Sequence, residues 1–148
     1  DKLSDGDTLI LAGSIPSSLP SDIYEKILGR LSGRNIKTVV DATKDLLLNV
    51  LKYKPFLVKP NNHELGEMFG TELKTDEEIE KYARKLQEMG AVNVLISMAG
   101  DVRCSLMNTE KCIAAEYAGE RSETPSAQVI QWSQDLRQAH SRVITNTL

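Results

Sequence analysis

The sequence predicts an α/β fold, in which a mostly parallel sheet is built from strands that alternate with helices. Short apolar runs without polar alternation are typical of parallel strands that are covered on both faces. Between these runs lie stretches with apolar residues at helical spacing, separated by segments rich in Gly, Pro and Ser. This alternation predicts part of a three-layer αβα domain over residues 1–101.

Each element can be located from its own local signal. The helix after Ser21 has apolar residues on one face, and the helix from Thr75 opens with a capping box completed by Glu78. The predicted strands are Thr8–Ala12, Lys37–Asp41, Phe56–Val58 and Val92–Ser97. The predicted helices run from Ser21 to Leu31, Thr43 to Leu51, Asn61 to Phe69, and Thr75 to just before Gly90.

Composition restricts the classes of function and partner. The 148 residues are 41% hydrophobic and 26% charged, with a net charge of -3, which argues against a nucleic-acid partner. No apolar run approaches the roughly 20 residues of a membrane helix. Cys104 and Cys112 form no CxxC pair, so we expect a reducing, cytoplasmic location. Because Asp1 is followed almost at once by a strand, we expect a piece of a longer protein.

The segment that follows the Phe56–Val58 strand carries the most suggestive chemistry. Lys59 can bind a phosphate as a point charge, and a helix that begins near Asn61 offers free N–H groups to an anion. The amide oxygen of Asn61 and the carboxylate of Glu64, one turn later, suit Mg²⁺. The alternative is structural, because an Asn cap with a Glu in the first turn commonly stabilises a helix start.

Three further strand ends are candidate ligand loops, because ligands of such sheets bind beyond the carboxyl ends of the strands. Residues 41–43, which begin with Asp41, form the loop after the second strand. Gly13-Ser14 follows the first strand, and Ser97 to Asp101 form a glycine turn after the fourth. Backbone amides in such turns can bind phosphate. A single glycine turn is weak evidence by itself, and residue chemistry alone favours an ordinary turn at Ser97 to Asp101 and similarly at Gly13-Ser14.

Taken together, these loops resemble one family. The segments LAGSIPSSLP, VVDAT, FLVKPNNHELGEMFG and VLISMAGD occur in the order and spacing of the ribokinase-like (PfkB) sugar kinases. The similarity is greatest to the branch of 1-phosphofructokinases and tagatose-6-phosphate kinases, and it runs from Asp1 to Asp101 without a gap. It is specific, because the KPN..E segment and the strand-end S.AGD fall in the right places together.

The resemblance implies a ribokinase-like fold and an ATP- and Mg²⁺-dependent kinase. Its reaction would convert fructose 1-phosphate to fructose 1,6-bisphosphate, with tagatose 6-phosphate as the alternative substrate. The partners would be a sugar phosphate and ATP, without nucleic acid or membrane. The family is often dimeric through a lid that this sequence does not contain.

The resemblance also implies which residues form the site. Asn61 and Glu64 match the N..E motif, which organises Mg²⁺ and the phosphates, and Lys59 matches the lysine beside ATP. Ser14 matches the serine of the G-S-[IL]-P loop near the sugar phosphate. The turn that holds the nucleotide phosphates is matched by Ser97 and Gly100.

Two parts of the family pattern do not occur in this sequence. The sugar-binding GGKG.N segment and the lid strands do not precede Asp1, and there is no GAGD motif. In the family that motif supplies the anion hole and the aspartate base. We therefore assign no catalytic residue and expect the chain to be truncated and inactive alone, since phosphoryl transfer depends on positioning and charge stabilisation. The alternative function is that of a non-catalytic remnant with weak nucleotide binding.

The apolar residues of 102–148 are scattered and show little periodicity. We therefore expect these residues to form a disordered or irregular tail. A frameshift explains this tail. If one nucleotide is missing after the Asp101 codon, the codons of Thr124 to Leu136 are compatible with NSVGAGDS[MV]VAGF, which contains the missing motif. Trp132 leaves only Met or Val at its position and Val129 leaves only Gly or Ser, and both positions fit the motif.

The frameshift hypothesis predicts that a single-base insertion near the Asp101 codon restores the GAGD reading frame. Sequencing the DNA on both sides of that codon is the measurement. A genuinely divergent tail is the alternative, and it is established if no single-base change restores the motif.

Overall fold

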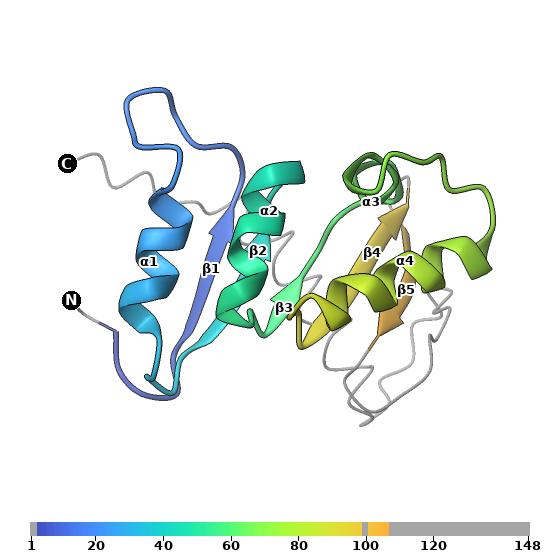
Figure 1. The fold of residues 1–148 in the computed structure, drawn as a ribbon. Helices are drawn as coiled ribbons and strands as arrows, with labels where there is room; N and C mark the ends of the chain where they lie inside the picture. Colours follow the sequence, from blue (N-terminus) through green and yellow to red (C-terminus); the bar gives the residue numbers. More distant parts are fainter. Residues whose placement is uncertain (1–2, 99–100, 107–148) are drawn as a thin grey trace. The chain divides into compact units, whose positions relative to one another are not determined.

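The computed structural model describes residues 3–98 and 101–106, which belong to one compact unit, Asp1–Glu116 (Figure 1). These residues form a five-stranded sheet in the order β1-β2-β3-β4-β5, so that spatial order follows chain order. The first four strands are parallel, and β5 pairs antiparallel with β4. The strands are β1 (Thr8–Ala12), β2 (Lys37–Asp41), β3 (Leu57–Val58), β4 (Asn93–Met98) and β5 (Asp101–Leu106).

Helices connect the parallel strands and agree with the predicted elements to within two residues at each end. The prediction of a mostly parallel α/β sheet is therefore confirmed. In the described part of the chain, no helix has the length and apolar character needed to cross a membrane. The helices are α1 (Ile23–Leu31), α2 (Lys44–Val50), α3 (Asn62–Met68) and α4 (Asp76–Glu88), and a short 3₁₀ helix, η1 (Leu51–Tyr53), follows α2.

One row of aligned side chains forms the centre of the core. Leu11, Val40, Val58 and Val94 are paired in register across β1 to β4, and all four are buried. Residues paired across neighbouring strands point to the same face of a sheet. The same cluster includes buried residues of all four α-helices, so these helices pack on that one face.

The opposite face of the central strands is buried as well. Val39, Leu57 and Leu95 alternate with the residues of the central row and are at most 2% exposed. Both faces of these central strands are therefore buried, as is typical of parallel strands. Ile10, on the outer strand β1, is 41% exposed by contrast.

The start of α4 shows how the sequence fixes a helix boundary. The Thr75 hydroxyl accepts from the Glu78 N–H at 3.2 Å, and the Glu78 carboxylate accepts from the Thr75 N–H. Backbone donors of Lys74 and Thr75 hold the pKa of Glu78 below its usual value. The capping box predicted from the sequence is therefore confirmed.

Regular structure continues past Asp101, where the sequence predicted an irregular tail to begin. β5 spans Asp101–Leu106 and pairs with β4 through a register irregularity between Ile96 and Ser97. The local sequence is compatible with a strand, because Val102, Cys104 and Leu106 alternate with polar residues. The remainder of the predicted tail, residues 107–148, lies outside the described residues, as does Gly100.

Candidate functional site

The carboxyl ends of the parallel strands are joined by main-chain hydrogen bonds. The Gly13 N–H donates to the Asp41 carbonyl at 2.9 Å, which connects the residue after β1 to the end of β2. The Lys59 N–H donates to the Val40 carbonyl at 3.1 Å, which connects β2 to the residue after β3. The predicted loops after β1, β2 and β3 therefore lie side by side.

The loop after β3 is joined to the end of β4 in the same way. Asn61 forms an isolated parallel bridge with Ser97, and the Ser97 N–H donates to the Pro60 carbonyl at 3.2 Å. Ser97 is half-buried near the end of β4. Two residues predicted from different strand ends, Asn61 and Ser97, are thus neighbours at one edge of the sheet.

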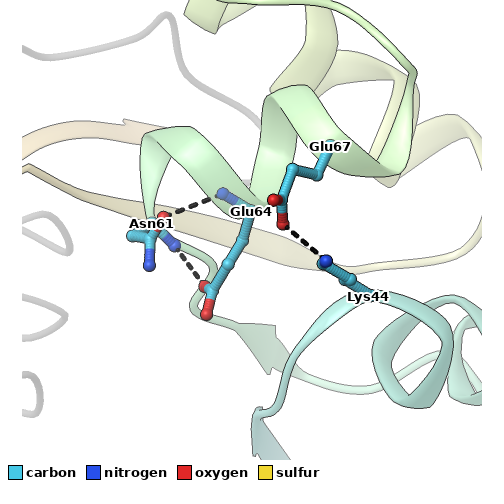
Figure 2. Close-up of polar contacts among 4 residues, drawn as sticks. All are labelled: Lys44, Asn61, Glu64 and Glu67. Carbon is cyan, nitrogen blue, oxygen red and sulfur yellow. Dashed lines mark hydrogen bonds and ion pairs between the residues drawn. The ribbon is translucent and has the colours of Figure 1, made fainter.

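Asn61 and Glu64 form a reciprocal capping box at the start of α3 (Figure 2). The Glu64 N–H donates to Asn61 Oδ1 at 2.8 Å, and the Asn61 N–H donates to Glu64 Oε2 at 2.8 Å. Both side chains are half-buried. The structural interpretation of this pair is therefore confirmed, and it leaves their role toward a ligand as a prediction.

The capping box is compatible with a metal ligand at Glu64. Its Oε2 atom accepts the Asn61 N–H, and the carboxylate has a second oxygen. Mg²⁺ in phosphate-transfer sites keeps several waters and uses only one or two carboxylates. Among residues 3–98, no group of three or more His, Cys, Asp or Glu could hold a metal ion. A magnesium ion at Glu64 would take its other ligands from waters and phosphate oxygens. Glu64 fits such a site better than Asn61, whose amide oxygen is engaged in the cap.

Lys59 makes an ion pair that the sequence did not predict. Its Nζ lies 3.1 Å from Asp41 Oδ2, and the two side chains are 19% and 25% exposed. The pair follows from register, because Val40 pairs with Val58 and the next residues of both strands are therefore neighbours. The sequence marked the Asp41 loop as a ligand loop, but the partner of Lys59 becomes visible only once β2 and β3 are aligned.

A second contact between neighbouring strand-end segments was also not predicted. Lys44 Nζ lies 3.1 Å from Glu67 Oε2, which connects the start of α2 to α3 (Figure 2). Lys44 has a φ of 42°, in the left-handed region that non-glycine residues rarely adopt. Both side chains are more than half exposed, so the ion pair itself contributes little to stability.

Ser14, the residue predicted to lie near the sugar phosphate, is exposed just beyond β1. It follows Gly13, whose φ of 89° requires the freedom of glycine. Ser14 reaches the same edge as Lys59 through the Gly13–Asp41 hydrogen bond. The structure thus brings Ser14, Lys59, Asn61, Glu64 and Ser97 to the carboxyl edge of one sheet.

Comparison with known proteins defines the class of this protein. The model of the pfkB family of carbohydrate kinases matches residues 1–117. This range is most of the chain and includes every described residue. The chain therefore belongs to the pfkB carbohydrate kinase family. The match extends beyond Asp101, where the resemblance was predicted to end.

Individual relatives are sugar-phosphate kinases. The chain is 54% identical to the 1-phosphofructokinase of Bacillus subtilis over 99 residues, which is 67% of this chain and 33% of that protein. It is 34% identical to the D-tagatose-1-phosphate kinase of Bacillus licheniformis, over 65% of this chain and 32% of that protein. The chain thus spans about a third of the length of these relatives.

A solved structure supports the same fold. A Staphylococcus aureus protein assigned as a phosphofructokinase superimposes with a TM-score of 0.69 at 35% identity. The superposition covers 85% of this chain and 41% of the other. The ribokinase-like fold class predicted from the sequence is therefore confirmed.

Removal of the Asn61 cap tests its structural role separately from ligand binding. Asn61→Ala removes the oxygen that accepts the Glu64 N–H and should lower the free energy of unfolding by about 0.5–2 kcal/mol. Asn61→Ser should recover most of that loss, because serine is an equally good cap. Urea unfolding followed by circular dichroism measures both, and equal stability of the alanine and wild-type chains would contradict the capping role.

Proposed function

We propose that this chain carries the nucleotide-binding edge of an ATP-dependent sugar-phosphate kinase of the 1-phosphofructokinase type. The observation that carries the proposal is the convergence of Lys59, Asn61, Glu64 and Ser97 at one edge of the sheet. Ligands of open α/β sheets bind at this edge. The 54% identity to a 1-phosphofructokinase supports fructose 1-phosphate as the acceptor and fructose 1,6-bisphosphate as the product.

Lys59 would supply fixed positive charge to the phosphates of ATP. Its ammonium group is held by Asp41 and its side chain is only 19% exposed, so its position is set before nucleotide arrives. A preorganised charge in a partly buried site stabilises developing negative charge without reorganisation. Because Asp41 lies beside Lys59, a phosphate that approaches the lysine is also repelled by a carboxylate. The positive charge of Mg²⁺ bound with ATP would offset that repulsion.

Glu64 would hold Mg²⁺, with the capping box fixing the orientation of its carboxylate. The hydrogen bond from the Asn61 N–H fixes Oε2, so the second oxygen has a defined direction. Mg²⁺, when bound with ATP, neutralises charge on the phosphate oxygens during transfer. Asn61 would then act on the metal mainly through the orientation of Glu64.

The alternative is a non-catalytic remnant that binds nucleotide weakly. It is favoured by one sequence observation, the lack of a GAGD motif in the 148 residues. We infer, with the frameshift hypothesis, that the base and anion hole are not encoded in the frame translated here. The chain then descends from a kinase but does not catalyse phosphoryl transfer by itself.

Nucleotide binding tests the proposed site. Lys59→Ala should weaken Mg²⁺–ATP binding at least tenfold, about 1.4 kcal/mol, because it removes the charge nearest the phosphates. Glu64→Gln keeps an acceptor for the capping box but removes the charge, so the Mg²⁺ dependence of binding should fall while stability changes little. Isothermal titration calorimetry with and without Mg²⁺ measures both effects.

Lys74→Ala is the matched control, because Lys74 makes an ion pair with Glu72, at 3.2 Å, whose side chains are mostly exposed and lie between α3 and α4. Its affinity for ATP should equal that of the wild type. Unchanged nucleotide binding in Lys59→Ala would show that the role assigned to Lys59 is wrong.

Turnover separates the two candidate functions. The chain alone should form no fructose 1,6-bisphosphate from ATP and fructose 1-phosphate above the rate without protein. The 1-phosphofructokinase of Bacillus subtilis serves as the positive control in the same coupled assay. Measurable turnover by this chain would contradict the inferred loss of activity and would establish an active kinase.

A further inference from the structure

Tyr24 connects the start of α1 to the end of β1. Its single O–H is shared between the carbonyl oxygens of Ala12 and Gly13, each 3.1 Å from the hydroxyl oxygen. The loop between these elements includes Ser14 and continues to Pro20. The two ends of that loop are therefore held together by one side chain that the sequence did not single out.

Gly13 is held by hydrogen bonds on both sides of its Cα atom. Its N–H donates to the Asp41 carbonyl at 2.9 Å, and its carbonyl accepts from the Tyr24 hydroxyl. Its φ is 89°, and no heavy atom would lie within 4 Å of an added Cβ. Hydrogen bonds rather than close packing thus hold this left-handed conformation, which directs the chain into Ser14.

We propose that Tyr24 is a positioning residue, which holds the Gly13–Ser14 turn in place for the phosphate group of the sugar substrate. The inference rests on the proposed function, because that function has a sugar phosphate as its substrate and the family resemblance places Ser14 near its phosphate group. Ser14 is exposed and follows the held glycine directly. Loss of the Tyr24 hydroxyl would therefore act on the ligand through Gly13.

The surroundings of Tyr24 suit this role. Its ring packs against the core cluster on the helix-covered face, which restrains the hydroxyl. Burial, and then the neighbouring Asp41 carboxylate, raise the pKa of Tyr24, so the hydroxyl remains a protonated donor at neutral pH.

Asp41 extends the same arrangement to Lys59. Its carbonyl holds Gly13, and its carboxylate holds Lys59 at 3.1 Å. The turn that would meet the sugar phosphate and the lysine that would meet ATP are therefore both fixed to one residue at the end of β2. Tyr24 sets only the first of these two, which separates its effect from a general loss of structure.

The test uses the full 148-residue chain with Tyr24→Phe, which removes only the hydroxyl. Tyr82→Phe is the matched control, because Tyr82 lies on α4 and its ring contacts Phe69. Amide hydrogen exchange should become about 3- to 10-fold faster at Gly13, whose N–H donates to the Asp41 carbonyl, in Tyr24→Phe alone, because the glycine loses the hydrogen bond at its own carbonyl. Unchanged exchange at Gly13 would overturn the positioning role.

Ligand titrations followed by NMR at the Ser14 amide complete the test. Tyr24→Phe should raise the Kd for fructose 1-phosphate about 3- to 10-fold and leave the Kd for ATP unchanged. Equal Kd values for fructose 1-phosphate in both chains would overturn the inference while the proposed function stands. If the wild type binds ATP but not fructose 1-phosphate, the proposed acceptor and the substrate role of Tyr24 are both wrong, whatever the exchange result. Parallel losses for both ligands would show a purely structural effect.

Discussion

The register of the four parallel strands is the constraint on which the site depends. Leu11, Val40, Val58 and Val94 pair across the sheet and are buried beneath the helices. A slip of one residue in any strand would turn its apolar side chain to the other face, so burial fixes the alignment. Fixed alignment also brings all four strand ends to one edge, where the polar residues of separate loops meet.

The contacts at that edge serve stability and ligand geometry together. The Asn61–Glu64 box satisfies backbone donors of a seven-residue helix and orients a carboxylate by the same hydrogen bond. The Lys59–Asp41 pair keeps a half-buried ammonium from being uncompensated and sets its position. Substitutions at these positions therefore need paired measurements, since either role alone could explain a loss of binding.

Local sequence signals were sufficient to predict most of the fold, but they could not predict the long-range contacts. Apolar runs and capping patterns located the elements of the parallel sheet, because each signal lies within a few residues. The partners Lys59–Asp41 and Tyr24–Gly13 depend on which strands and helices become neighbours, and no local pattern encodes that. β5 was not predicted, because its six residues of alternating polarity lie at the start of a long segment without clear periodicity. The Asn61 and Glu64 pattern was recognised, but one pair of residue types satisfies both a cap and a ligand site, so sequence alone could not separate the two.

The order of the sheet has a consequence for how the chain folds. β2, β3 and β4 each pair with the strand that precedes them along the chain, so each of these three finds a partner that is already synthesised. Contacts between neighbours in sequence favour rapid folding and permit successive docking of units as a chain leaves the ribosome. The four parallel strands are all encoded before residue 99, so their pairing needs no later strand as a template. A change of reading frame after Asp101 would thus leave every residue assigned to this edge of the sheet unaltered.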